Sequence, residues 1–454
     1  MNQSTHHRSS RGRARAAGLT LTAALLLAAC GTSADGGAAS DDGTAEVNGE
    51  VAGAITVWTW DGAPGTEAMD RLAAAFERKT GVKVDSKVVS RDDYKQQAQL
   101  ALNAGEGIDV LGVQPGQFAT EVQSRLMPVS AYQSRLADGL DGYRPAAVEQ
   151  IRKLYKDDGV HSVPFGSTGS AVCFYNARIL DEAGVRPPET WKDVRKLTDA
   201  LKARRPGTLT LVKPSGKDTW FEDEFVLTLA GQRDPGFFDS VRYDGKPWNA
   251  SAYVTALERY GELYEDGTLQ RSGLDMGYTD AMNAFNTGKA AIVCNGSWEA
   301  ALLKKEYREE NDIAVPSVGV LPVPADDPSG RSLRSFLDIT WGIPKKARNA
   351  AAAAAFISYA TQEEGVDLWA GNLGFVPSAK DWKLAPDVLG DDTLASEGYA
   401  QIVDLINDPS SDRNNMSSFS DVVGGYVLEV ARGRMTARQA ADKGQKDLDS
   451  GLYN

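Results

Sequence analysis

The sequence predicts an α/β protein built from two lobes, each a mainly parallel sheet flanked by helices. Its 454 residues are too many for one hydrophobic core, which stops growing at roughly 250 to 300 residues. Strand-like and helical segments alternate along most of the chain, a pattern typical of parallel sheets. In the middle, residues 159–176 join two strand-like runs through a passage of small residues.

Residues 159–176, GVHSVPFGSTGSAVCFYN, contain the expected hinge. A β-prone run stands at either end, and Pro164, Gly166 and Gly169 interrupt the stretch between them. Small residues let a backbone absorb the φ and ψ changes of a hinge, which a chain needs where it leaves one lobe for another. A loop between two strands of a single domain would show the same local pattern. The prediction of a hinge therefore depends on the α/β segments on either side of this stretch.

Composition excludes several classes of function. The hydrophobic fraction of 42% and the charged fraction of 24% are those of a folded protein. The net charge is −13, and such an acidic surface repels nucleic acids and anionic lipid headgroups. His161 is the only histidine beyond residue 7, which excludes a histidine triad and a multi-histidine metal site. We therefore expect no catalytic residues, no metal and no cofactor.

Residues 1–29 predict a signal peptide for export. Arginines up to Arg15 precede an apolar run, residues 19–29, that is too short to span a bilayer and has the size of a signal-peptide core. The sequence Leu-Ala-Ala-Cys-Gly at residues 27–31 resembles the lipobox of bacterial lipoproteins, whose cysteine carries diacylglycerol and becomes the mature N-terminus. The resemblance implies lipidation of Cys30. A secreted protein cut near an A-x-A-like site is the alternative.

A flexible tether and then a β-α-β unit are expected to follow. Residues 30–50 are rich in Gly, Ala, Ser and Asp, a composition typical of disordered linkers. Residues 55–60 are strand-like, and residues 66–79 carry apolar side chains at helical spacing. Gly81 stands where a helix C-cap belongs, before a second strand at residues 82–84.

The alternation continues with a helix at about residues 91–104 and a strand at residues 108–113. Ligands bind such sheets at the carboxyl ends of the strands. In this lobe those ends carry Trp60, Asp61 and Gln114. We expect these three side chains to lie at the ligand site.

The second lobe is expected to follow the hinge. Thr190 is the predicted N-cap of a helix that buries Leu197, and residues 209–212 are strand-like. The end of this strand leads into a segment that carries Trp220 and Asp223. An aromatic ring beside carboxylates suits a polyol ligand, although Trp220 would equally serve packing.

Residues 285–298, FNTGKAAIVCNGSW, are the clearest site motif. A helix is predicted to end at Gly288, a buried strand follows, and a Gly-Ser turn then presents Trp298. Sugars have apolar C–H faces, and the face of a tryptophan is a surface that packs on them. A purely structural tryptophan is the alternative.

The chain is then expected to return to the first lobe. Residues 336–344 predict a strand that contains Trp341, and residues 348–361 predict an alanine-rich helix. Residues 371–378 would form the last crossing, and the helices after it, including residues 439–448, would pack on the second lobe. A structural role is one interpretation of Trp341.

Taken together, these motifs carry a resemblance to a known family. The order ITVWTWDG, YKQQAQLALNAGEGIDVLGV, VPFGSTGSAVCFYN, PPETWKDV, FNTGKAAIVCNGSW and ITWGIPKKARNAAAAAAFISYATQEEG resembles the extracellular solute-binding proteins of ABC importers, the group that includes maltose-binding protein. The resemblance covers the chain from about residue 54 to its end. It implies two lobes joined by crossing strands, with the ligand held in the cleft between them.

The resemblance also implies domain boundaries, partners and site residues. Residues 51–163 with 334–372 would form the N-terminal lobe, and residues 164–333 with 373–454 the C-terminal lobe. A monomer on the extracellular face of the membrane, held only by its lipid, would deliver a carbohydrate to the permease of an ABC transporter. It would bind no nucleic acid. The expected ligand-binding residues are Trp60, Asp61, Gln114, Ser167, Trp220, Asp223, Trp298, Asp338 and Trp341.

Two cysteines remain in the body of the chain, Cys173 and Cys294. Both lie in strand-like runs assigned to the same lobe, and an exported protein can oxidise them. A disulfide requires that their Cα atoms lie within about 7 Å, which the sequence leaves open. Two separate buried thiols are the alternative.

Other functions were weighed against carbohydrate binding. A secreted carbohydrate-active hydrolase would need two carboxylates at a set separation, and no pair stands out among the 62 acidic residues. A binding protein for a non-sugar polar solute is a further alternative, and a purely structural lipoprotein would explain only the anchor. The phosphate-binding pattern GxxxxGK[ST] is absent, which excludes the ATPase of a transporter.

Overall fold

The computed structural model describes residues 46–453, apart from residues 62–63, 156, 158, 331, 408–415 and 417. The predicted signal peptide, Cys30 and most of the predicted tether lie outside the described residues. The last part of that tether belongs to the folded protein, because Val47 is buried and its N–H donates to the carbonyl of Ala131 over 2.6 Å.

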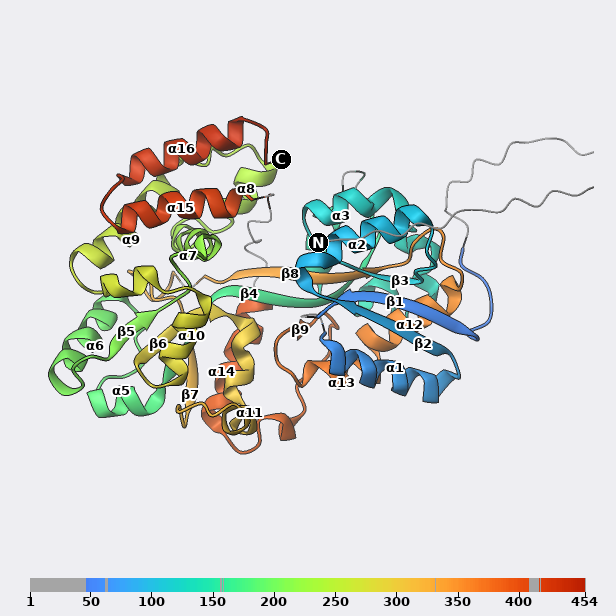
Figure 1. Ribbon diagram of the computed structural model, residues 1–454, viewed down its shortest axis with the longest axis horizontal. Coiled ribbons are helices and arrows are strands. Elements are labelled where there is room, and N and C mark those ends of the chain that lie inside the picture. Colours follow the sequence, from blue (N-terminus) through green and yellow to red (C-terminus); the bar gives the residue numbers. More distant parts are fainter. Residues whose placement is uncertain are drawn as a thin grey trace, which may run out of the picture. The chain divides into compact units, whose positions relative to one another are not determined.

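Nine strands form one mixed sheet with the order β2-β1-β3-β8-β4-β6-β5. The strands within each half pair in parallel, β1 with β2 and β3, and β5 with β6. The long strands β4 and β8 pair with each other in antiparallel fashion and run between the two halves (Figure 1). Strands β7 and β9 also pair with β4. The strands are β1 (Ala54–Trp60), β2 (Lys83–Val89), β3 (Val110–Val113), β4 (Val163–Asn176), β5 (Leu209–Val212), β6 (Ala290–Gly296), β7 (Val318–Pro322), β8 (Arg334–Gly342) and β9 (Val376–Pro377).

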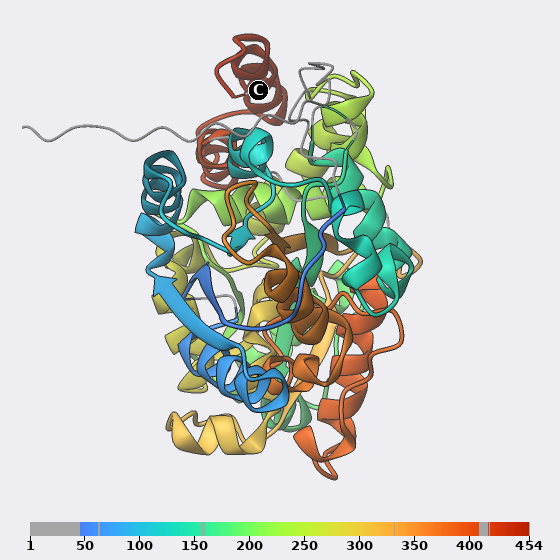
Figure 2. The ribbon, with the colours of Figure 1, turned by 90° about the vertical axis from the view of Figure 1, so that its right-hand side faces the viewer.

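Helices flank both halves of the sheet, with α1 and α2 beside β1 and β2, and α6 and α10 beside β5 and β6 (Figures 1 and 2). None of the helices in the described ranges is long and apolar enough to cross a membrane. The helices are α1 (Thr66–Thr80), α2 (Arg91–Ala104), α3 (Gln117–Val122), α4 (Pro145–Lys153), α5 (Ala177–Ala183), α6 (Trp191–Arg204), α7 (Thr219–Gly231), α8 (Phe237–Tyr243), α9 (Ser251–Glu265), α10 (Tyr278–Asn286), α11 (Lys305–Glu310), α12 (Ala350–Gln362), α13 (Asp367–Ala370), α14 (Thr393–Asn407), α15 (Phe419–Ala431) and α16 (Ala437–Asp449).

Local sequence signals explain several of these helices. α1 ends where predicted, because Gly81 adopts a left-handed φ of 77° and its N–H bonds the carbonyl of Glu77. α6 begins with a capping box in which Thr190 and Asp193 bond each other's backbone N–H groups. α12 begins two residues later than the predicted residue 348, because the Asn349 side chain caps it by accepting from the Ala352 N–H.

Strand β4 differs from its prediction. The sequence predicted two strands separated by a flexible passage, whereas the structure has one buried strand over Val163–Asn176. The small residues serve close packing, since a Cβ added to Gly169 would lie 2.5 Å from a methyl carbon of Leu333. Between Ser170 and Val172 the register with β6 shifts at Ala171, which is buried and has a φ of 61°. This is a β-bulge, a feature that bends a strand without ending it.

The apolar interior divides into three clusters, and β4 contributes to all of them. The first cluster takes its residues from 47–165 and 337–370 and includes Phe165. The second and third draw on residues 171–441 and 172–406, and include Cys173 and Phe174. Alternate side chains of β4 therefore face different cores.

A disulfide joins Cys173 of β4 to Cys294 of β6. The two residues face each other in the antiparallel register of these strands, and both are fully buried. They lie 121 residues apart in the sequence. The bond closes a long loop, and loop closure in the unfolded chain is the main route by which a disulfide stabilises a fold.

Replacing both cysteines with alanine should lower the free energy of unfolding by about 2 to 5 kcal/mol, because the unfolded chain regains the freedom that the bond removes. Calorimetric melting without reductant should show a lower melting temperature for the Cys173→Ala/Cys294→Ala variant. Added reductant should lower the melting temperature of the wild type and leave that of the variant unchanged. Equal melting of both proteins under oxidising conditions would contradict a stabilising bond.

Candidate functional site

Two tryptophans from separate segments meet on the second half of the molecule. Trp220 stands in the first turn of α7, and Trp298 follows the end of β6. Their ring centroids lie 6.2 Å apart with the ring planes at 43°, and both side chains are partly exposed. The structure thus brings together the two aromatic residues that the sequence assigned to this lobe.

Contacts around Trp298 fix its ring. A Cβ on Gly296 would lie 2.3 Å from carbons of the Trp298 ring, so only glycine lets the ring lie over the strand at that position. The indole Nε1 donates to the hydroxyl of Tyr278 over 2.9 Å. Because its N–H is used within the protein, Trp298 can offer only the face of its ring to a ligand.

Tyr278, which accepts this hydrogen bond, donates another one to Glu299. Its hydroxyl donates to Oε1 of Glu299, which also accepts from Nδ2 of Asn295 over 3.2 Å. Burial, and then the Glu299 charge, raise the pKa of the Tyr278 hydroxyl above its ordinary value, so the proton that it donates is retained. Burial also raises the pKa of Glu299, although the hydrogen bond from Tyr278 opposes that shift. Tyr278 and Glu299 were not predicted, because the sequence gives no sign that they meet.

Helix α15 holds the start of α7, and with it Trp220. A Cβ on Gly424 of α15 would lie 1.8 Å from the carbonyl oxygen of Thr219, so only glycine allows the two helices to approach this closely. The hydroxyl of Ser420 donates to Oδ2 of Asp223 over 2.9 Å. Asp223 is fully buried, so in this structure its carboxylate contacts neighbouring side chains and presents no surface to solvent.

Three consecutive buried carboxylates distinguish α7, namely Glu222, Asp223 and Glu224. Oε1 of Glu222 lies 2.7 Å from Nζ of Lys213, which is also buried. Burial lowers the pKa of the Lys213 ammonium, and the Glu222 carboxylate opposes that shift. This pair was not predicted, although acidic residues inside an otherwise apolar helix indicate buried partners of opposite charge.

The predicted residues of the first half stand at one edge of the sheet. β1 and β3 are parallel neighbours, so Asp61 and Gln114 follow adjacent strand ends. Asp61 is exposed and Gln114 is partly exposed. Trp60 lies in the core instead, with its ring 5.3 Å from that of Tyr94.

The crossing strands carry the remaining predicted residues. Ser167 of β4 faces Leu337 of β8 and is almost fully buried, whereas Asp338 is partly exposed. Trp341 is completely buried and stacks on Phe356, with ring planes at 12° and centroids 5.6 Å apart. Its burial favours the structural alternative, and we leave Trp341 out of the proposed site.

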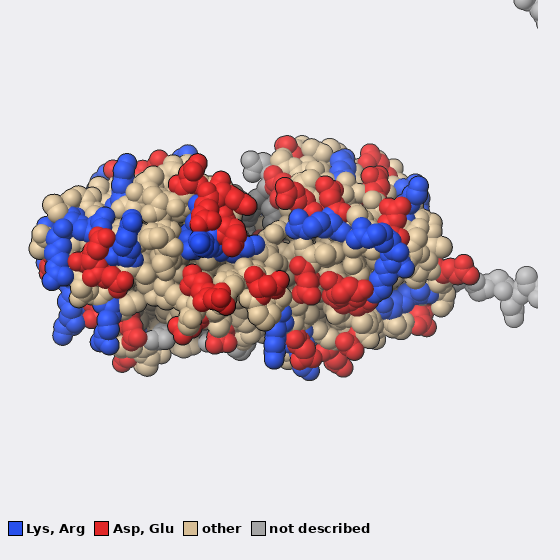
Figure 3. All heavy atoms as spheres, turned by 90° about the horizontal axis from the view of Figure 1, so that it is seen from below, with Lys and Arg blue, Asp and Glu red and all other residues tan. Residues whose placement is uncertain are grey.

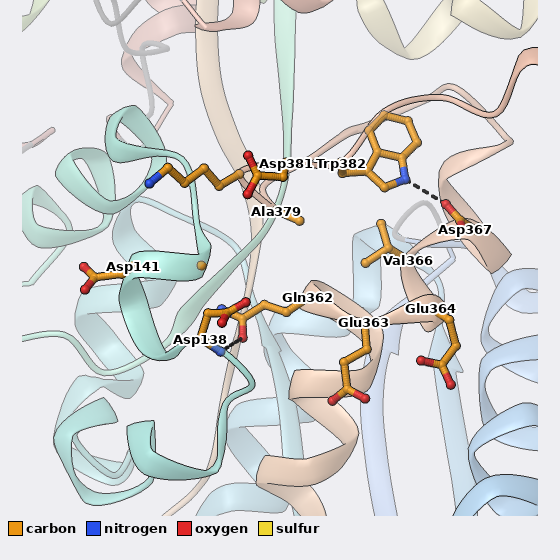
Figure 4. A pocket seen from close by; sticks show the side chains of 12 residues that line it. Asp138, Asp141, Gln362, Glu363, Glu364, Val366, Asp367, Ala379, Asp381 and Trp382 are labelled. Carbon is orange, nitrogen blue, oxygen red and sulfur yellow. Dashed lines mark hydrogen bonds between the residues drawn. The ribbon is translucent and has the colours of Figure 1, made fainter.

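A separate hollow of about 660 Å³ lies where the segment after α12 meets the segment after β9 (Figure 4). It contains none of the predicted ligand residues. The hollow is lined by Asp138, Asp141, Gly142, Gln362, Glu363, Glu364, Val366, Asp367, Ala379, Lys380, Asp381 and Trp382.

Within the described part of the chain, no group of three or more His, Cys, Asp and Glu side chains is placed to hold a metal ion. On the face shown in Figure 3, acidic and basic side chains are interspersed, so a nucleic-acid backbone would meet carboxylates there.

The molecule has two α/β halves joined by long crossing strands. One half carries polar strand ends and the other an aromatic pair, and this arrangement defines a two-lobed binding protein. The model of one family, bacterial extracellular solute-binding proteins, matches residues 71–395. The chain belongs to this family, as the sequence motifs predicted.

Curated relatives and solved structures agree with this assignment. The chain is 23% identical to the arabinooligosaccharide-binding protein of Bacillus subtilis over 415 residues, which is 87% of this chain and 91% of that protein. It is 21% identical to the multiple sugar-binding protein of Streptococcus mutans over 305 residues, 64% of this chain and 67% of that protein. The GacH receptor of Streptomyces glaucescens has a similar fold, with a TM-score of 0.67, 19% identity, and coverage of 89% of this chain and 100% of that one.

Removing the Tyr278 hydroxyl should lower the free energy of unfolding, because this hydroxyl bonds both Trp298 and Glu299. Tyr278→Phe leaves the indole N–H and the Glu299 carboxylate each without this partner, and such a loss at this partly buried site should cost about 1 kcal/mol. Denaturant unfolding should show the loss. Tyr307→Phe is the control, because Tyr307 is 36% exposed on α11. Equal stability of the two variants would show that the Tyr278 network contributes little.

Proposed function

We propose that the protein captures a carbohydrate by closing its two lobes and delivers it to the permease of an ABC transporter. The observation that carries this proposal is the partly exposed pair Trp220 and Trp298. Membership of the solute-binding family supports it, as do the sugar-binding names of the two curated relatives. In this proposal the N-terminal lobe comprises residues 51–163 and 334–372, and residues 164–333 and 373–454 make up the C-terminal lobe.

The tryptophan pair suits a sugar for a physical reason. A pyranose ring has C–H groups on its faces and hydroxyls around its edge, so an aromatic face packs on one part while polar groups bind the other. Trp298 has no free N–H, which makes it an apolar platform rather than a hydrogen-bond donor. The hydroxyls of the sugar would then be bound by side chains of both lobes and of the crossing strands.

Closure would follow from contacts that exist in only one state. Asp61 and Gln114 stand at strand ends of the first lobe, whereas Trp298 stands on the second. A sugar that touches both sets binds the closed form better than the open form, and only such a difference in affinity shifts the equilibrium. Ser167 and Asp338 are the proposed contacts on the crossing strands.

The protein is proposed to bind its ligand without changing it and to act as a monomer. No catalytic residue, cofactor or metal is part of the proposal. Mass spectrometry should therefore recover a bound oligosaccharide unchanged after long incubation, whereas a carbohydrate-active hydrolase would release shorter products. A thermal-shift screen against a sugar panel would identify the ligand, because a ligand at 100 times its Kd stabilises the folded state by about 2.7 kcal/mol.

Trp298→Ala should weaken sugar binding by about thirtyfold, since the loss of a large aromatic contact in a desolvated site costs at least about 2 kcal/mol. Calorimetric titration of the variant and the wild type with the sugar found in the screen would measure this. Trp382→Ala is the matched control, because Trp382 is also partly exposed and bonded through its Nε1, to Asp367 over 2.8 Å, but lies in the separate hollow. Wild-type affinity in Trp298→Ala would remove the main support for this proposal.

We also propose that Cys30 carries a lipid that holds the protein on the outer face of the cell membrane. Cys30→Ala should release the protein into the medium, because a short tether without an acyl chain has nothing to hold it at the membrane. Fractionation of cells, followed by detection of the protein in membranes and medium, would measure the change. Ser33→Ala should stay in the membrane fraction. Retention of Cys30→Ala in that fraction as well would refute lipidation at this position.

A further inference from the structure

Arg334, the first residue of β8, is a buried arginine whose hydrogen bonds are not satisfied. Its side chain is only 1% exposed. Within the part of the chain that the structure describes, its Nε and Nη2 have no hydrogen-bond partner. Oε2 of Glu224 lies 4.0 Å from Nε, which is an ion pair beyond hydrogen-bond distance. Buried donors of this kind need an explanation, because leaving them unpaired is costly.

A second buried arginine, in contrast, has hydrogen-bond partners for both of its terminal nitrogens. Arg308 on α11 is 4% exposed, and its Nη1 donates to the carbonyls of Leu302 and Leu303 over 2.7 and 2.9 Å. Its Nη2 donates to the carbonyl of Pro316 over 3.0 Å. Arg308 therefore serves the fold by fixing three carbonyl groups, whereas Nε and Nη2 of Arg334 fix none among the described residues.

Two buried hydroxyl groups beside Arg334 also lack hydrogen-bond partners among the described residues. Ser170 of β4 faces Arg334 directly in the antiparallel register, and Thr168 precedes Ser170 by two residues on the same face. Both side chains are buried, and the Oγ of Ser170 and Oγ1 of Thr168 have no partner among the described residues. One face of the crossing strands thus gathers three polar side chains whose hydrogen bonds are unmade.

This face is also the one on which Trp298 lies. Ser170 pairs with Arg334 on one side and with Gly296 of β6 on the other, so the three residues form a row across three strands. A Cβ on Gly296 would point to the same face as the side chains of Ser170 and Arg334, and it would meet the Trp298 ring at 2.3 Å. The ring therefore covers one end of the row, and Arg334 stands at the other.

Helix α7 connects the two ends of the row. Trp220, which pairs with Trp298, and Glu224, which pairs with Arg334, are four residues apart and so lie on the same side of the helix. Four helical residues span about 6 Å. A ligand that packs on the tryptophans is therefore within reach of the Arg334 guanidinium.

We propose that Arg334, with Ser170 and Thr168, binds neighbouring hydroxyls of an uncharged saccharide that packs on Trp298. This inference rests on the proposed function and names its ligand class. The fork of N–H groups on a guanidinium matches two adjacent oxygen acceptors, and the serine and threonine hydroxyls can donate or accept. The Arg334 charge is balanced by Glu224, and Asp223 precedes Glu224 on α7. A uronate would bring a further negative charge against these carboxylates, which disfavours it.

The test compares four proteins by calorimetric titration and by melting without ligand. They are the wild type, Arg334→Gln, Ser170→Ala and the control Arg308→Gln. The probes are three neutral oligosaccharides, maltotriose, raffinose and arabinotriose, and one uronate, trigalacturonate. Arg334→Gln should bind the best neutral probe at least about tenfold more weakly, since hydrogen bonds from a charged group are the strong ones. Arg308→Gln should melt at a lower temperature and keep its affinity within twofold.

Ser170→Ala keeps the inference testable if Arg334→Gln fails to fold. Its hydroxyl has no partner to lose in the free protein, so the variant should melt at the wild-type temperature or above it. Its affinity for the neutral probe should fall about three- to tenfold.

The outcomes separate this inference from the proposed function. Wild-type affinity in both Arg334→Gln and Ser170→Ala would overturn the assignment of this row, while carbohydrate capture would stand. Tighter binding of trigalacturonate than of every neutral probe would overturn the uncharged ligand class and also leave carbohydrate capture standing. Binding of no saccharide, neutral or acidic, by the wild type would instead overturn the proposed function on which the inference rests.

Discussion

Strand β4 pairs with β6, β7, β8 and β9 along its 14 residues, and both halves of the molecule depend on this pairing. The strand leaves the first core at Phe165 and enters the other two at Ala171 and Val172. A strand so fully paired cannot act as a loose linker. The lobe closure that we propose would be absorbed where the register of β4 shifts, which happens against β8 at Gly166 and against β6 at Ala171.

The sequence was sufficient for elements whose signals are local, and insufficient where distant contacts decide. Gly81 and Thr190 mark helix ends by their own chemistry, so α1 and α6 were predicted correctly. Glycines inside β4 indicated a break, because the strands that keep β4 extended lie far away in the sequence. For the same reason Trp298 and Trp341 could not be told apart: the packing of Phe165 and Phe356, which come from distant segments, shows that Trp341 is interior. The Tyr278 and Arg334 contacts are also long-range and left no local pattern.

Helix α7 places its charges on two different sides. Glu222 pairs with Lys213 at 2.7 Å, whereas Glu224 and Arg334 are 4.0 Å apart. Burying charged groups is expensive, and a close pair repays more of that cost than a distant one. The first pair therefore belongs to the fold, whereas Nε and Nη2 of Arg334 in the second pair have no hydrogen-bond partner among the described residues and are the donors that we propose for a ligand.

The disulfide between Cys173 and Cys294 has a consequence for how the exported chain matures. The sequence contains three cysteines, and three free thiols can be oxidised in three different ways, of which one is native. A thioether to lipid at Cys30, as we propose, leaves no thiol at that position to be oxidised. The remaining two cysteines then have a single possible product, so the chain would reach its native bond without a disulfide isomerase.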